Sequence, residues 1–213
     1  PGDVVAVLMP RNSWHVFACE LGIFKAGGIA LMLDMNIPQD TLQHQLTDSR
    51  SVLVLRDGTS SDLLHTGCNV PTLNIVNFFG TFDVADNSRI LDDISQLDET
   101  REQHSPENDS NSAPASIVYT SGSTGKPKGV VCSHGSLSHY VLCESDIFKL
   151  YSGFDSMAQI CSLSWCSHIF DLYVCWAAGT RLVVFQDDLV RSGPDFLSAL
   201  ILSNTTIMST VPS

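Results

Sequence analysis

The sequence predicts an α/β fold of largely parallel sheets flanked by helices. Apolar runs of about five residues, such as Val4–Leu8 and Ile29–Leu33, are typical of buried strands. They alternate with stretches of about 10–15 residues in which apolar side chains recur at helical spacing, as at Phe17, Leu21 and Phe24. This alternation indicates βαβ units arranged around a parallel sheet.

Capping and turn residues set the expected boundaries. Asn12 or Ser13 can cap the first helix, Gly27-Gly28 can end it, and Pro38 can open the second helix. The expected helices are 13–26, 38–49, 136–148, 168–178 and 194–203. The expected strands are 4–8, 29–33, 52–55, 72–76, 117–120, 157–161, 181–185 and 206–211.

Composition limits the classes of function. The chain has 213 residues, of which 44% are hydrophobic, enough to bury one core. Its net charge is −12, and the segment 83–109 alone carries nine acids against two bases. A broad basic face for nucleic acid is therefore not expected. We expect no signal peptide, because Asp3 lies where a basic n-region would be. No uncharged apolar run approaches the ~18–20 residues of a membrane span. We expect neither nucleic acid nor membrane as a partner.

The cysteines and one polar stretch are the other organising features. Seven cysteines, an odd number without a Cys-x-x-Cys pair, indicate reduced thiols in a cytoplasmic protein rather than disulfides. Cys161, Cys166 and His168 could suggest zinc, but no second ligand pair lies at a suitable spacing, so no metal site of the protein's own is predicted. Residues 98–114 are polar, charged and poor in large apolar side chains, which predicts a flexible loop.

The segment Ile117–Gly129 carries the residues best suited to chemistry. It runs from a predicted strand into a loop with three glycines, four hydroxyl side chains and two lysines. Glycines let the backbone approach a ligand closely, and successive N–H groups in such a loop form a concave site for anions. The lysines supply positive charge in an otherwise acidic chain. These properties favour a polyphosphate ligand over a merely flexible Gly/Ser hairpin.

This loop is not a Walker A motif, because its glycines are too closely spaced and Pro127 follows Lys126. Instead, Tyr119–Gly129 resembles the phosphate-binding signature of the adenylate-forming (AMP-binding) superfamily. That superfamily includes acyl-CoA synthetases, luciferases and the adenylation domains of nonribosomal peptide synthetases. The family's downstream His-x-x-Leu is present as His134 to Leu137.

Two further segments make the resemblance strongest to the peptide-synthetase adenylation domains. Phe24–Gly28 and Leu33–Pro38 resemble the family segment LKAGAAYVPLDPSYP, and Leu46–Ser49 with the strand after it continues the match. The resemblance covers nearly the whole chain and is weakest at 83–114. It implies that residues 1–213 are an incomplete adenylation domain that lacks the small C-terminal lid domain.

The resemblance also implies an activity. A carboxylate attacks the α-phosphorus of ATP to give an acyl-adenylate and pyrophosphate, and a phosphopantetheine thiol of a carrier protein or domain then takes the acyl group. ATP and Mg²⁺ are the implied cofactors, and a small carboxylic acid is the substrate. Thr124 and Lys126 are expected to act directly on the phosphates. The expected cofactor-binding residues are Thr120, Ser121, Gly122, Ser123, Thr124, Gly125, Lys126 and Lys128.

A second family motif, SFDxSVxDxxxxLLAGAxLVV, places an Asp beside the ammonium of an amino-acid substrate. Phe170-Asp171 matches its first letters, but the motif has fourteen steps from Phe to Gly, whereas Phe170 to Gly179 is nine. Aligned without a gap on Gly179, Cys166 stands at the Asp position, and we prefer that alignment. A buried ammonium without a carboxylate is costly, so an aryl, keto, hydroxy or fatty acid is favoured. The implied substrate-binding residues are Trp165, Cys166, Ser167 and Phe170.

Two alternatives stay open. An acyl-CoA synthetase shares the phosphate loop, although Leu33-Asp34 and Asp48-Ser49 follow the peptide-synthetase pattern. A non-catalytic remnant is consistent with Cys166 at the Asp position. The family places its Mg²⁺-associated Glu, ribose-binding Asp and catalytic Lys beyond the segments matched here. The isolated 213-residue chain is therefore expected to be inactive.

Overall fold

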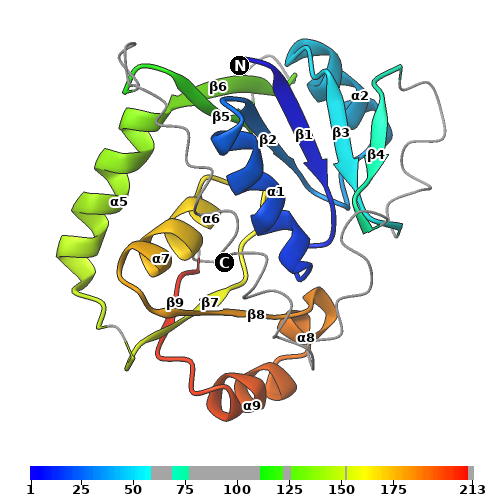
Figure 1. Cartoon of the computed structure of the whole chain (residues 1–213). Coiled ribbons are helices and arrows are strands. Elements are labelled where there is room, and N and C mark those ends of the chain that lie inside the picture. Colours follow the sequence, from blue (N-terminus) through cyan, green and yellow to red (C-terminus); the bar gives the residue numbers. More distant parts are fainter. Residues whose placement is uncertain (59–68, 77–110, 122–125, 152, 211–213) are drawn as a thin grey trace.

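The structure is a computed structural model of the chain, and it describes residues 1–58, 69–76, 111–121, 126–151 and 153–210 (Figure 1). Among these residues, six strands form a first sheet in the order β4-β3-β1-β2-β5-β6. Neighbouring strands run parallel except β6, which is antiparallel to β5. The strands are β1 (Val4–Leu8), β2 (Ile29–Leu33), β3 (Leu53–Arg56), β4 (Thr72–Asn74), β5 (Pro114–Thr120) and β6 (Lys128–Ser133).

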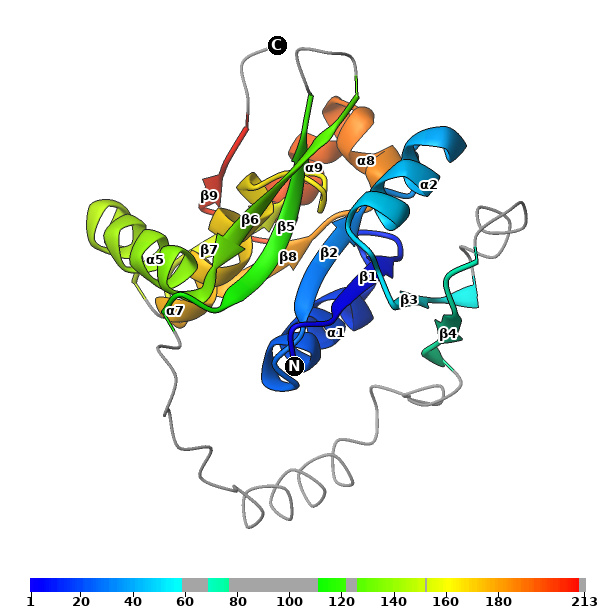
Figure 2. The same cartoon turned by 90° about the horizontal axis from the view of Figure 1, so that it is seen from above.

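The central strands of this sheet are buried on both faces. Side chains alternate across a strand, so Val7 and Met32 pack against helix α1 (Trp14–Lys25). Leu8 and Leu31 point the other way, into a second cluster with Leu42 and Leu46 of helix α2 (Gln39–Asp48). Figure 2 shows the two helices on opposite sides of β1 and β2. This two-sided burial explains why these strands are continuous apolar runs.

A second, three-stranded sheet has the order β8-β7-β9 and is entirely parallel. One face packs against helix α5 and the helical run α6–η3–α7, and the other packs against α8 and α9. Its strands are β7 (Ser156–Gln159), β8 (Arg181–Val184) and β9 (Ile207–Met208). Its helices are α5 (His134–Phe148), α6 (Ser167–Ile169), the π-helical η3 (Phe170–Val174), α7 (Cys175–Ala177), α8 (Asp187–Arg191) and α9 (Pro194–Leu202).

The predicted fold class is confirmed, and most expected elements are present with ends shifted by a few residues. Strand β6 and helix α8 were not predicted from the sequence. The predicted loop 98–114 is wrong at its end, because Pro114 begins β5 and the amide of His134 donates to the carbonyl of Ala113 at 2.9 Å. Residues 98–110 of that loop lie outside the described part of the chain.

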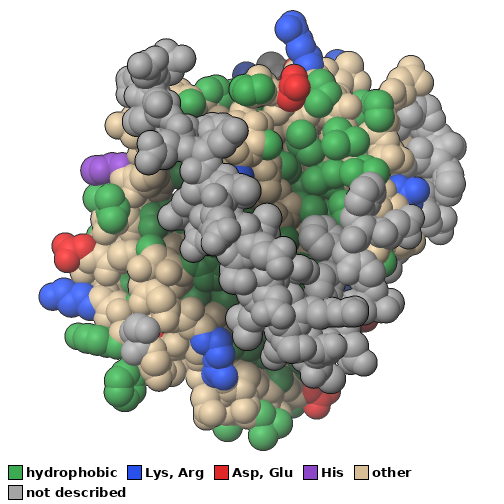
Figure 3. Space-filling view, viewed as in Figure 1, with side chains coloured by type: hydrophobic (Ala, Val, Ile, Leu, Met, Phe, Trp, Pro, Cys, Tyr) green, Lys and Arg blue, Asp and Glu red, His purple; other side chains and the backbone are tan. Residues whose placement is uncertain are grey.

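Two surface properties bear on partners. No helix in the described part of the chain is long and apolar enough to cross a bilayer. On the face drawn in Figure 3, the coloured Lys and Arg side chains are scattered singly rather than gathered in a patch.

Candidate functional site

The predicted phosphate loop is the connection of a β-hairpin. Strands β5 and β6 pair so that Thr120 lies opposite Lys128 and Tyr119 lies opposite Gly129. Gly122, Ser123, Thr124 and Gly125 fall outside the described residues, so their expected roles stay predictions. The hairpin brings together the flanking members of the predicted set, and all of them are exposed: Thr120, Ser121, Lys126 and Lys128.

Gly129 is required at the base of this hairpin by the ring that crosses it. A Cβ atom added to Gly129 would lie 3.2 Å from Cγ2 of Ile117, 3.2 Å from Cζ of Tyr119 and 3.4 Å from the Tyr119 hydroxyl. These distances are shorter than the usual carbon–carbon contact of about 3.5–4.0 Å. Gly129 was predicted to let the backbone approach a ligand, but in the structure it makes room for the Tyr119 ring within the hairpin.

We expect Gly129→Ala to lower the free energy of unfolding by about 1 kcal/mol or more, because the ring of Tyr119 is held and cannot easily move aside. Urea unfolding of the chain would measure it. Gly22→Ala in helix α1 is the matched control, since a Cβ there meets nothing within 4 Å. The control should be neutral or stabilising by up to about 1 kcal/mol. Equal stability of the two variants would contradict the packing role.

Helix α2 fixes the base of the hairpin. The hydroxyl of Tyr119 donates to Oδ2 of Asp48 at 2.8 Å and lies 3.3 Å from the carbonyl of Gln45. Burial, with the hydrogen bond and charge of Asp48, raises the pKa of Tyr119 well above its usual value, so the phenol stays a neutral donor. On the far side of the loop, Nε2 of His44 donates to the carbonyl of Pro127 at 3.1 Å. Both ends of the predicted phosphate loop are therefore tied to one helix.

The charges at the loop suit a polyphosphate. Within the part of the chain that the structure describes, neither Lys126 nor Lys128 forms an ion pair with an acid, and both are exposed. Two ammonium groups beside the exposed hydroxyl residues Thr120 and Ser121 form a donor set that matches phosphate oxygens. The residues that are described here therefore fit the phosphates of a nucleotide.

The predicted acid-binding segment is residues 162–168, which include Trp165, Cys166 and Ser167. The hairpin and this segment border one hollow, the Trp165 pocket, of about 380 Å³. Tyr119 contributes from the hairpin, and Ser164 with Trp165 from the segment before α6. The side chain of Trp165 is 55% exposed. The rest of the lining is Met32, Asp34, Asn36, Ile37, Thr41, Gln45 and Arg191.

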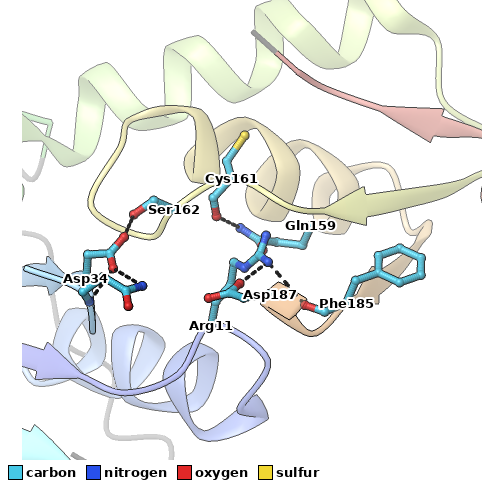
Figure 4. A network of polar contacts seen from close by, with 8 residues as sticks. Arg11, Asp34, Gln159, Cys161, Ser162, Phe185 and Asp187 are labelled. Atoms are coloured by element: carbon cyan, nitrogen blue, oxygen red, sulfur yellow. Dashed lines mark hydrogen bonds and ion pairs between the residues drawn. The ribbon is translucent and has the colours of Figure 1, made fainter. Parts of the chain in front are cut away.

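A polar network holds the predicted acid-binding segment against the carboxyl ends of the first-sheet strands (Figure 4). Asp34, which follows β2, accepts a hydrogen bond from the hydroxyl of Ser162 and another from the backbone amide of Asn36 at 2.8 Å. Arg11, which follows β1, pairs with Asp187 at the start of α8. Residues that follow β1 and β2 therefore contact the segments that follow β7 and β8. These contacts lie at the carboxyl ends of parallel strands, where a site is expected.

Comparison with known proteins is consistent with this geometry. The sequence model of the AMP-binding enzymes matches residues 1–213. The chain belongs to the AMP-binding enzyme family. It is 30% identical over 213 residues to bacitracin synthase 3 of Bacillus licheniformis, and 28% identical over 218 residues to a dimodular nonribosomal peptide synthase of Bacillus subtilis. Both alignments cover the whole chain but only 3% and 8% of those relatives. Novobiocin biosynthesis protein H of Streptomyces niveus is 28% identical over 91% of the chain and 31% of its own length.

Solved structures support the fold of the AMP-binding family. The nonribosomal peptide synthetase FmoA3, in an α-methyl-L-serine-AMP bound form, superposes with a TM-score of 0.78 at 23% identity, covering all of this chain and 21% of that one. VinN in complex with 3-methylaspartate gives a TM-score of 0.74 at 22% identity, covering 99% of this chain and 52% of that one. The chain thus spans less than a third of the first curated relatives and about half, or less, of these structures.

The two candidates for the ammonium position lie in different environments. Cys166 is exposed, beside Trp165 at the start of helix α6. Asp171 is completely buried in η3, and neither carboxylate oxygen has a hydrogen-bond partner of good geometry among the described residues. Burial raises the pKa of Asp171 to about 6, against the smaller lowering effects of Cys161, His168 and Arg11. Ser167 is half-buried at the first position of α6, and only the backbone of Phe170 is described.

Proposed function

We propose that this chain is the phosphate- and acid-binding part of an enzyme that uses ATP to activate a carboxylic acid as an acyl-adenylate. The observation that carries the proposal is the Trp165 pocket, where the base of the phosphate-loop hairpin and the acid-binding segment meet. Membership of the AMP-binding family supports the same reaction. An oxygen of the acid attacks the α-phosphorus, and the bond from that phosphorus to pyrophosphate breaks.

In this reaction the chain binds, orients and balances charge. Such phosphorus chemistry depends mainly on positioning and on charge stabilisation. Lys126 and Thr124 would contact the phosphates directly, and Lys128 and Thr120 lie opposite each other at the base of the same hairpin. Mg²⁺, when bound with the nucleotide, would supply further neutralisation of the phosphate charge.

The substrate that we propose is a carboxylic acid without an α-amino group. At Cys166 an exposed neutral thiol would stand where an amino-acid substrate needs a carboxylate, so an aryl, keto, hydroxy or fatty acid suits the site better. Asp171 is poorly placed for that role, because its side chain is 0% exposed. This assignment rests on the ungapped alignment.

Transfer of the acyl group to a phosphopantetheine thiol of a carrier protein or domain is the second step of the proposal. Its support is the names of the relatives, which include a dimodular nonribosomal peptide synthase and a nonribosomal peptide synthetase. Transfer to coenzyme A is the runner-up, and an o-succinylbenzoate CoA synthetase from Bacillus subtilis shares the fold at a TM-score of 0.71.

The six described cysteines are free thiols, which suits the reducing cytoplasm.

The test is acid-dependent exchange of pyrophosphate into ATP. We expect exchange from the intact protein that contains these residues, assayed with a panel of aryl, keto, hydroxy and fatty acids and the proteinogenic amino acids. We expect only background exchange from the 213-residue chain alone, because it spans at most 31% of the three curated relatives named above. Exchange by the isolated chain, or none from the intact protein with any of these acids, would overturn the corresponding proposal.

A further inference from the structure

A buried acid and a buried histidine connect helix α1 with the acid-binding segment. The side chains of Glu20 and His168 are 1% and 3% exposed, and Nε2 of His168 lies 3.2 Å from Oε1 of Glu20. Glu20 lies on the buried face of α1, which it shares with Val16 and Ile23. A carboxylate is costly to bury there unless it is paired. Neither member of the pair lines the Trp165 pocket, so binding of substrate does not account for them.

The hydrogen bonds of His168 define its protonation. Nδ1 lies 2.8 Å from the carbonyl oxygen of Trp165, which can only accept, so Nδ1 carries a proton. Nε2 faces the carboxylate of Glu20, which accepts a hydrogen bond, so Nε2 carries a proton as well. Burial alone would lower the pKa of His168, but the charge and hydrogen bond of Glu20 and the Trp165 carbonyl outweigh it and raise the pKa. The geometry therefore favours a charged imidazolium between two acceptors.

This pair is one of two anchors of the acid-binding segment. At the start of the segment, Ser162 donates to Asp34 at the end of β2 (Figure 4). At its end, His168 is held by Glu20 of α1 and itself holds the backbone of Trp165. Trp165 and Cys166 are both exposed. They lie between the contact of Ser162 with Asp34 and the contact of His168 with Glu20.

We propose that Glu20 and His168 are positioning residues that hold Trp165 in the acid-binding pocket while His168 is charged, and release it when His168 loses its proton. The pocket's role in acid binding rests on the proposed function, but the release itself does not. Because the folded pKa of His168 is raised, its stabilising contribution is complete below the ordinary value of about 6.5. The contribution is lost as the pH rises through the folded pKa.

Two other titratable groups lie near the pair, and their titration must be distinguished from that of His168. The carboxylate of Asp171 lies close enough to His168 for their charges to interact, and its pKa is raised to about 6 by burial. The phenol of Tyr173 lies against Glu20. Burial and, after it, the charge of Glu20 raise the pKa of Tyr173, so the phenol stays neutral between pH 5 and pH 9.

The test follows the His168 ring and Trp165 together in the 213-residue chain. The ring nitrogens are observed by NMR with ¹⁵N-labelled histidine, and the indole of Trp165 by its fluorescence in a Trp14→Phe/Trp176→Phe background, from pH 5 to pH 9. We expect both ring nitrogens to be protonated at pH 6.5, and the Trp165 emission to change with the same midpoint as the His168 titration. A neutral ring at pH 6, or an emission that is constant through the titration, overturns the proposal.

Variants identify the partner. Glu20→Gln keeps the size and a hydrogen bond but removes the charge, so both midpoints should fall together by at least one pH unit. Asp171→Asn should leave the shared transition in place, and its disappearance would show that Asp171, not Glu20, controls Trp165. His139→Gln changes an exposed histidine of α5 and should change nothing. If Glu20→Gln fails to fold, the coincidence of the two wild-type midpoints remains decisive.

A kinetic readout separates this proposal from the proposed function. In the intact protein, with the acid that gives the fastest pyrophosphate exchange, Glu20→Gln should raise the KM for that acid about tenfold and leave the KM for ATP unchanged. An equal rise in both constants would indicate general damage and contradict the positioning role. Absence of exchange with any acid would contradict the proposed function, while the spectroscopic result on the free chain would still decide whether Glu20 and His168 control Trp165.

Discussion

Replacing Lys126 with alanine is expected to slow acid-dependent pyrophosphate exchange by the intact protein at least ~100-fold. Lys126 is exposed at the end of the phosphate loop, and no acid among the described residues neutralises it. Removal of one preorganised donor to developing charge typically costs about 10²–10³ in rate. Pyrophosphate exchange at saturating acid and ATP measures the effect.

The matched control for this prediction is Lys25→Ala. Lys25 is also an exposed lysine, and it lies in the last turn of helix α1, outside the hairpin. Its removal changes the net charge by the same amount and should leave exchange within about twofold, because isolated surface charges contribute little. If Lys126→Ala were no slower than Lys25→Ala, the phosphate role of the hairpin would be lost.

The fold was predictable where local sequence determines burial. Strands β1 and β2 are covered by helices on both faces, and that burial leaves a continuous apolar run in the sequence. Strand β6 was missed because its first four residues are exposed, and its extended form comes from pairing with β5. Helix α8 has only five residues, too few to show a helical period.

The candidate site shows the same division between local and long-range information. The phosphate loop is one contiguous signature, so its residue types could be recognised directly. The contacts that position the site join residues far apart in the chain. Tyr119 and Asp48 are separated by 71 residues, Ser162 and Asp34 by 128, and His168 and Glu20 by 148. A carboxylate on the apolar face of helix α1 was the one local sign that Glu20 has a buried partner.

The substitution Cys166→Asp is expected to create a response to α-amino acids. It places a carboxylate at the position that the ungapped alignment assigns to the substrate ammonium, so a bound amino acid would no longer bury its charge without a partner. A charge-assisted hydrogen bond contributes about 1.5–3 kcal/mol. Exchange with the best amino acid should therefore rise roughly 10- to 150-fold relative to the parent protein. Exchange with uncharged acids of similar shape should fall.

Asp171→Asn is the counterpart that decides between the two alignments. Asp171 is buried, and its folded pKa of about 6 lies above the ordinary value of 3.8, so its contribution to stability is complete below about pH 4 and is lost as the pH rises through 6. The asparagine variant should be free of that loss, which urea unfolding at pH 4 and pH 7 measures, and its preference among acids should match the parent. If the parent instead activates an amino acid and Asp171→Asn abolishes it, Asp171 is the ammonium partner and the assignment of Cys166 is wrong.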